Sequence, residues 1–295
     1  MANLTFKERL MGPQTPGRRP RRAAYALPTL FTAGNIFLGF LAILRAFQGA
    51  MFADTGNLGA NHSFEVSALA IGLAVVLDGL DGRIARMTNT VSDFGREMDS
   101  LADVITFGIA PAVLAFAWGV QFVPPDSRNI AHRLGYFISF LYLLCGAARL
   151  ARFNVQTNPI PKNPGRPDRK YFIGLPIPAG AAIVASIVYA GDCVPLQWWF
   201  WSVLWMALLA LVSFLMVSTW RYPSFKDVHL LRPRSFWTLI VMGALVYLTF
   251  LFPQPVLLGI SAAYVSTGIV LRAGGIVRRR FRQPPPPPQP EHQIG

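Results

Sequence analysis

Four aspartates stand out because they occur in stretches that are otherwise apolar. Asp78 and Asp81 lie in the last third of an apolar stretch that ends near residue 86, and Asp99 and Asp103 begin the next one. A carboxylate inside a membrane-spanning helix is unfavourable unless it faces a polar cavity, a charged partner or a metal ion. These four side chains are therefore the first candidates for a functional site.

The spacing of the aspartates predicts that all four meet. Asp78 and Asp81 are three residues apart and Asp99 and Asp103 are four apart, so each pair shares one face of a helix. The first helix approaches one membrane face and the second returns from it, which places both pairs at a similar depth. Carboxylate oxygens suit Mg²⁺ or Mn²⁺, whereas zinc favours histidine or cysteine, and the sequence has neither nearby. We therefore expect a site for divalent metal ions.

Small and basic residues lie close to the aspartates in sequence. Gly82, Ala85 and Gly95 would let a ligand approach the backbone, although close helix packing is the commoner reason for small residues in membranes. Arg86 can either bind a phosphate or mark the cytoplasmic end of its helix.

One sequence pattern joins these residues: Asp78-Gly-Leu-Asp81-Gly82-Arg-Ile-Ala85-Arg86, eight residues, Gly95, three residues, Asp99, three residues, Asp103. It resembles the signature of the CDP-alcohol phosphatidyltransferases at every fixed position. The resemblance implies that a CDP-linked lipid donates its phosphatidyl group to an alcohol and releases CMP, with two divalent ions bridging the pyrophosphate. By position, Asp78, Asp81 and Asp99 would be metal ligands. Asp103 would bind the second metal ion and deprotonate the acceptor hydroxyl.

The resemblance also implies a set of substrate contacts. The CDP-linked lipid would be contacted by Gly82, Ala85, Arg86, Ser92 and Gly95, and by two polar residues at a matching depth in the first span, Thr32 and Asn35. Arg149 and Arg152 leave the fourth span at the same level and are candidates for contacts to the acceptor or to a phosphate. Their charge is explained equally well by the excess of basic residues in cytoplasmic loops.

Three regions outside the signature resemble the branch of the family that uses L-serine as the acceptor alcohol. They are residues 27–35, residues 99–111, and residues 148–154 followed by 174–178. The donor would then be CDP-diacylglycerol. The resemblance covers residues 27–190 and also suggests a homodimer.

The signature leaves other functions open. A sister enzyme that uses glycerol 3-phosphate or inositol phosphate as acceptor would need the same aspartates. A cation transporter is an alternative of another class, but its carboxylates should lie near the middle of the membrane.

The elements that must position these residues are membrane-spanning helices. The chain is 53% hydrophobic and only 14% charged, whereas soluble domains carry about 25% charged residues. Apolar blocks of about 20 residues, the length that crosses a bilayer, predict an all-α, polytopic transmembrane bundle of about eight spans. We place the spans near residues 28–50, 65–86, 98–122, 131–152, 176–192, 197–219, 236–252 and 256–272. The last two are separated only by residues 252–255 and could instead form one kinked or re-entrant hairpin.

Basic residues predict the orientation of the spans. The N-terminal segment, alternate loops and the C-terminal tail are rich in arginine and lysine, whereas the intervening loops carry only Arg128 and Arg133, with Arg45 near the outer end of the first span as an exception. Because cytoplasmic loops are enriched in positive charge, we expect both termini and the active site to face the cytoplasm from the inner cell membrane. The net charge of +13 comes from basic residues that are clustered between apolar blocks, and this pattern does not indicate nucleic-acid binding.

The predicted organisation has four parts. Residues 1–26 form a basic cytoplasmic segment, 27–192 the catalytic core, 193–273 additional spans, and 274–295 a basic, proline-rich tail that we expect to be disordered. Cys145 and Cys193 should be inert and unpaired, because the topology places them toward opposite membrane faces. The four histidines should have ordinary surface roles.

Overall fold

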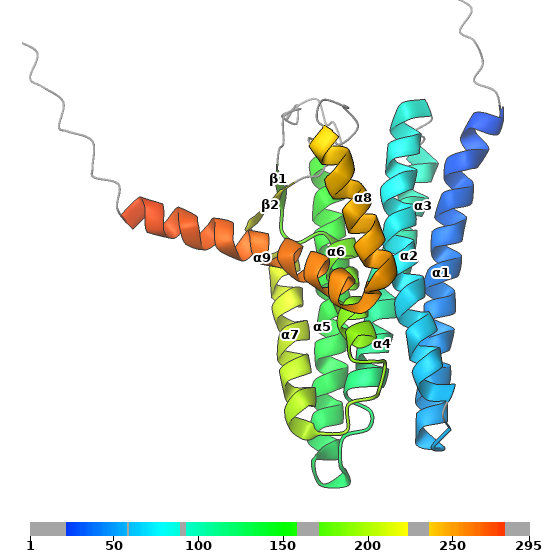
Figure 1. Cartoon of the computed structure of the whole chain (residues 1–295), viewed down its shortest axis with the longest axis vertical. Helices are drawn as coiled ribbons and strands as arrows, with labels where there is room; N and C mark the ends of the chain where they lie inside the picture. Colours follow the sequence, from blue (N-terminus) through cyan, green and yellow to red (C-terminus); the bar gives the residue numbers. More distant parts are fainter. Residues whose placement is uncertain (1–21, 58, 89–92, 158–170, 224–235, 281–295) are drawn as a thin grey trace, which may run out of the picture.

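The computed structural model describes residues 22–57, 59–88, 93–157, 171–223 and 236–280, and these are almost entirely helical (Figure 1). The helices are α1 (Arg22–Asp54), α2 (Gly59–Thr88), α3 (Asp93–Asp103), α4 (Ala110–Gly119), α5 (Pro125–Thr157), α6 (Ile177–Ala190), α7 (Trp199–Val217), α8 (Phe236–Leu251) and α9 (Pro253–Arg280). A π-helix, η1 (Val104–Ile109), connects α3 to α4. Two short strands, β1 (Tyr171–Ile173) and β2 (Arg221–Pro223), pair antiparallel.

Each of the eight stretches predicted to span the membrane coincides with helix. Six stretches of the described residues are long and apolar enough to cross a bilayer, and they lie in α1, α2, the continuous α3–η1–α4 segment, α5, α7 and α9. Helix α6 has 14 residues and α8 has 16, fewer than the roughly 20 that a crossing needs. The chain is thus a multi-pass helical membrane protein, and the count of eight crossings stays a prediction. Both termini lie outside the described residues, and their cytoplasmic placement also stays a prediction.

Small residues bring α1 and α2 close together along one side of the bundle (Figure 1). Ala42 and Ala46 of α1 are fully buried, and the Ser67 hydroxyl of α2 donates to the Ala42 carbonyl at 2.8 Å. A Cβ on Gly49 would lie 2.9 Å from the Phe64 ring. Such close backbone approach is how small residues stabilise helix pairs in lipid. The pairing holds the start of α1 beside the end of α2.

The α3–η1–α4 segment is the most buried of the six apolar stretches. It contacts α1, α5 and α6, and its residues Phe107, Ala110 and Leu114 are fully buried. Helix α3 itself is short and begins with charged residues. Asp99 and Asp103 therefore lie where a polar helix enters the apolar core.

Helix α7 belongs to the same core, although it follows the domain boundary predicted at residue 192. It packs against α5, and its residues Leu209, Val212 and Leu215 are buried in the common apolar cluster. The boundary itself stays a prediction.

Helix α9 departs from the direction of the other helices. Figure 1 shows it lying crosswise to the other helices, with its C-terminal end projecting away from them. Near its start it is attached to α6 and the turn that follows: the Ser186 and Ser261 hydroxyls are 2.7 Å apart, and Gln254 donates to the Asp192 carboxylate at 2.8 Å. Further along, a Cβ on Gly268 would overlap Tyr222 of β2.

Candidate metal centre

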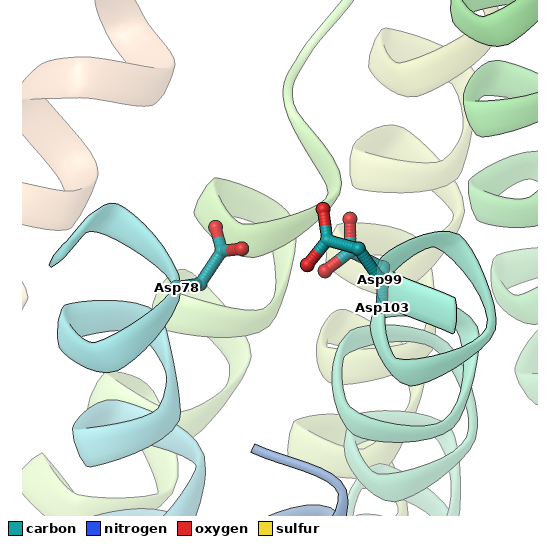
Figure 2. A group of neighbouring side chains, drawn as sticks. All are labelled: Asp78, Asp99 and Asp103. Carbon is teal, nitrogen blue, oxygen red and sulfur yellow. The ribbon is translucent and has the colours of Figure 1, made fainter. Parts of the chain in front are cut away.

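Three of the four predicted aspartates come together between α2 and α3. Asp78, Asp99 and Asp103 each offer a carboxylate oxygen, and these oxygens lie within 4.8 Å of one another. Figure 2 shows the Asp78 side chain reaching from α2 toward the pair on α3. The four-residue spacing of Asp99 and Asp103 places them one above the other on the same helix face. The predicted meeting of the two helices at the carboxylates is thus present for these three residues.

The surroundings of the carboxylates fit a divalent cation. Asp103 is 9% exposed and Asp81 is 8% exposed, and one oxygen of each, Oδ1, is buried without a hydrogen-bond partner among the described residues. A buried anionic oxygen without a donor is costly, and a cation relieves that cost. A donor set of carboxylate oxygens suits Mg²⁺ or Mn²⁺.

Asp81 is held by a neighbour on α1 and lies beside the other three. The Thr32 hydroxyl donates to Asp81 Oδ2 at 3.1 Å, and both residues are buried. Asp81 is close enough to Asp99 to interact with it electrostatically. The structure therefore connects Thr32 to the site through Asp81, and a direct role of Asp81 as metal ligand stays a prediction.

Arg149 of α5 brings a buried positive charge to the aspartates. It is 8% exposed, interacts electrostatically with Asp103 and Asp78, and has its guanidinium 5.6 Å from the centre of the Phe153 ring. A guanidinium in this position can balance the carboxylates and bind a phosphate. A contact of Arg149 with the acceptor or with a phosphate stays a prediction.

Arg152 makes hydrogen bonds within the protein. Its guanidinium donates to the Val217 carbonyl at 3.0 Å and to the Ile173 carbonyl at 3.2 Å. These bonds satisfy carbonyl groups at the end of α7 and tie β1 to it, a common use of basic residues at helix C-termini. A substrate contact by Arg152 stays a prediction without support from these bonds.

The other predicted contacts divide into described and undescribed residues. Asn35 is 3% exposed and its side-chain oxygen has no hydrogen-bond partner among the described residues. Gly95 lies in α3, one turn before Asp99. The remaining predictions fall on side chains outside the described part of the structure, and they are Gly82, Ala85, Arg86 and Ser92.

The structure adds three residues that sequence reasoning missed. Thr106 and Tyr142 donate hydrogen bonds around η1, to the carbonyls of Asn35 and Phe107. Tyr264 of α9 interacts electrostatically with Arg149. A hydroxyl within an apolar stretch is the only signal of Thr106 and Tyr142. Tyr264 lies outside the region of resemblance, and no sequence signal connects it to Arg149.

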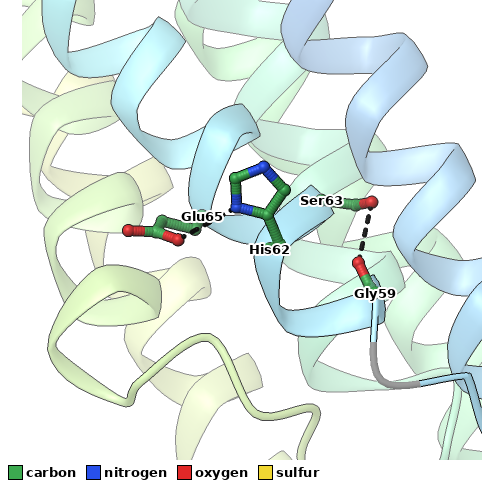
Figure 3. A network of polar contacts seen from close by, with 4 residues as sticks. All are labelled: Gly59, His62, Ser63 and Glu65. Atoms are coloured by element: carbon green, nitrogen blue, oxygen red, sulfur yellow. Dashed lines mark hydrogen bonds and ion pairs between the residues drawn. The ribbon is translucent and has the colours of Figure 1, made fainter.

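His62 and both cysteines lie outside the cluster of aspartates. His62, at the opposite end of α2, is 72% exposed and lies 3.4 Å from Glu65 (Figure 3). Cys145 and Cys193 are free thiols. Burial, together with nearby Glu65 and Asp192, raises the pKa of the Cys193 thiol to about 12. A thiol with so high a pKa is inert at neutral pH.

Comparison with known proteins supports the same chemistry. Residues 25–213 match the CDP-alcohol phosphatidyltransferase family. The chain is 36% identical, over 89% of its length and 94% of the relative's, to a Helicobacter pylori protein named CDP-diacylglycerol–serine O-phosphatidyltransferase. It is 31% identical, over 68% of its length and 91% of the relative's, to a Bacillus subtilis protein of the same name. It is also 35% identical to an archaetidylserine synthase from Methanothermobacter thermautotrophicus, over 67% of this chain and 70% of that protein.

Proposed function

Because this chain belongs to the CDP-alcohol phosphatidyltransferase family, we propose that it transfers the phosphatidyl group of CDP-diacylglycerol to the hydroxyl of L-serine. The serine oxygen forms a new bond to the phosphorus next to diacylglycerol, the bond from that phosphorus to the CMP oxygen breaks, and CMP leaves. The product is phosphatidylserine. The chain is thus a transferase of phospholipid biosynthesis. The observation that carries the proposal is the convergence of Asp78, Asp99 and Asp103 within the family signature.

Divalent metal ions are the cofactors that this donor set fits. Asp78, Asp99 and Asp103 would hold Mg²⁺ or Mn²⁺, and Asp81 would complete the ligands for two ions. When bound, such ions neutralise the pyrophosphate and stabilise the departing CMP.

The protein's own residues supply the rest of the chemistry. A free oxygen of the Asp103 carboxylate accepts the proton of the serine hydroxyl as the new bond forms. Arg149 attracts the phosphates by its positive charge and keeps the donor close to the aspartates.

Serine as acceptor is supported by the names of the relatives and by the regions outside the signature. Glycerol 3-phosphate and inositol phosphate are the competing acceptors. The decisive assay supplies purified protein with CDP-diacylglycerol and each alcohol in turn and follows CMP release. We expect release with serine at a rate well above the others, and faster release with either phosphate-bearing alcohol would overturn the assignment.

The same assay tests the metal. We expect chelation by EDTA to stop CMP release and added Mn²⁺ or Mg²⁺ to restore it. Activity that persists in EDTA would contradict metal-dependent transfer. The alternative of a cation transporter is not supported, because the chain belongs to a transferase family and its aspartates lie toward the end of α2 and not at its middle.

We further propose that the enzyme is a homodimer in the inner membrane and that its site faces the cytoplasm. The clustering of basic residues in alternate loops supports this orientation. CMP and serine are water-soluble, which requires that the aspartates be reached from an aqueous face. The dimer is supported by family resemblance alone, and cross-linking in native membranes would test it.

A further inference from the structure

A π-helix directly follows Asp103, and a proline lies just after its end. In η1, the Ala110 N–H donates to the Ile105 carbonyl, five residues earlier. Pro111 comes next, at the start of α4. Proline has no amide hydrogen, and inside a helix its ring crowds the carbonyl four residues earlier, which here belongs to Phe107. In a regular α-helix the Phe107 carbonyl would accept from the amide of residue 111, and proline at that position has no amide hydrogen to donate.

Tyr142 of α5 supplies a donor to that carbonyl. Its hydroxyl donates to the Phe107 carbonyl at 3.2 Å, and its side chain is fully buried. Glycines allow the helices to approach: a Cβ on Gly108 would lie 2.9 Å from Leu143, and one on Gly180 would lie 3.4 Å from the Tyr142 hydroxyl. A hydrogen bond between two fully buried residues on different elements is unfavourable to break, so this bond stabilises η1 against α5.

Thr106 joins the same turn to a second helix. Its hydroxyl donates to the Asn35 carbonyl of α1 at 3.0 Å, and its side chain is also fully buried. A Cβ on Gly39 would lie 2.6 Å from this hydroxyl, so α1 and η1 are in close contact. Two buried hydroxyl groups therefore hold η1 between α1 and α5, within one turn of Asp103.

We propose that Tyr142, together with Thr106, is a positioning residue for the metal centre. The two hydroxyls fix the rotation of η1 about its axis. Because α3 continues into η1 without a break, they also fix the direction in which Asp99 and Asp103 point toward Asp78. This inference rests on the proposed function in taking the three aspartates as metal ligands. Residues that orient metal ligands without touching the metal commonly control its affinity.

The test is a Mn²⁺ titration of the purified protein without substrate. The electron paramagnetic resonance signal of the free ion measures how much Mn²⁺ remains unbound. Tyr142→Phe removes one oxygen and keeps the ring. We expect it to weaken Mn²⁺ binding roughly tenfold. Tyr136→Phe changes an exposed tyrosine on the same helix and should leave the binding as in wild type. Thermal unfolding without metal separates a loss of stability from a loss of metal affinity.

The outcomes separate this inference from the proposed function. If the wild-type protein binds Mn²⁺ and Tyr142→Phe binds it with the same affinity, the positioning role is overturned and the metal centre stands. This holds even if the variant unfolds at a lower temperature. A wild-type protein that binds no Mn²⁺ would overturn the metal centre itself.

If Tyr142→Phe does not fold, variants of Thr106 provide a second, independent test with the same Mn²⁺ titration. Thr106→Ser keeps the hydroxyl and should bind Mn²⁺ nearly as wild type does. Thr106→Val keeps the shape without the hydroxyl and should bind it several-fold more weakly. Equal Mn²⁺ affinities of the two variants would contradict the inference.

Discussion

At the scale of single residues, the buried carboxylate of Asp103 gives the first prediction. Asp103→Asn keeps the size of the side chain but removes its charge and its ability to accept a proton. We expect CMP release to fall roughly 10³-fold, as loss of a general base does, while binding of CDP-diacylglycerol stays measurable. Glu97→Gln, an exposed change on the same helix, should leave the rate near that of wild type. A near wild-type rate for Asp103→Asn would show that another group takes the proton.

The Cys193 thiol gives a prediction that depends on pH. Its pKa is raised to about 12, so it is protonated across the neutral range, and only about 10⁻⁴ of it is the reactive thiolate at pH 8. In a Cys145→Ala background, we expect iodoacetamide to label the folded protein far more slowly than the protein in SDS. Labelling should accelerate about tenfold per pH unit toward the pKa. Equal labelling rates at pH 8 in the two states would contradict this.

The aspartates were predictable because charge within an apolar stretch is visible in the sequence itself. The convergence of Asp78, Asp99 and Asp103 followed from helical spacing and from the return of the chain. The sequence did not predict the hydrogen bonds of Arg152, whose guanidinium donates to the carbonyls of Val217 in α7 and Ile173 in β1. Which partner a guanidinium finds depends on packing between residues far apart in the chain.

At the scale of elements, Gly174 controls how β1 leads into α6. Its φ is +79°, its N–H donates to the Trp220 carbonyl at 2.8 Å, and a Cβ there would overlap the Met216 carbonyl. Alanine would be strained by the positive φ and by this overlap. We expect Gly174→Ala to lower the free energy of unfolding in detergent by about 3 kcal/mol.

A matched control for Gly174→Ala lies in α2. Gly72→Ala places a Cβ where no atom lies within 4 Å, and alanine favours helix over glycine. Its stability should equal or slightly exceed that of wild type. If the two variants were equally stable, the constraint on Gly174 would be refuted.

Hydropathy located the helices but not their internal irregularities or their directions. Residues 104–109 form a π-helix, although their sequence is that of an ordinary apolar helix and Pro111 is the only local hint. The crosswise direction of α9 was also not predictable. An apolar stretch indicates that a helix is buried in lipid, but it does not indicate the direction in which the helix runs. The contact between Ser186 and Ser261, which joins α9 to α6, was likewise not visible in the sequence.

At the scale of the whole molecule, the orientation in the membrane is open to a direct test. In a background without Cys145 and Cys193, His62→Cys and Val155→Cys place thiols at exposed positions, at the start of α2 and near the end of α5. A membrane-impermeant maleimide should label His62→Cys in intact cells, and Val155→Cys only after permeabilisation. The reverse pattern would contradict the predicted orientation. CMP release by both variants serves as the control for folding.

The carboxylates lie toward one end of apolar stretches that are long enough to cross a bilayer, and this has a kinetic consequence under the proposed function. The diacyl donor need not leave the bilayer to react, so it reaches the enzyme by lateral diffusion in two dimensions. Its effective concentration is its mole fraction among the lipids and not its amount per volume of solution. Dilution with inert detergent at constant bulk donor concentration should therefore slow turnover, whereas the water-soluble acceptor obeys ordinary bulk saturation.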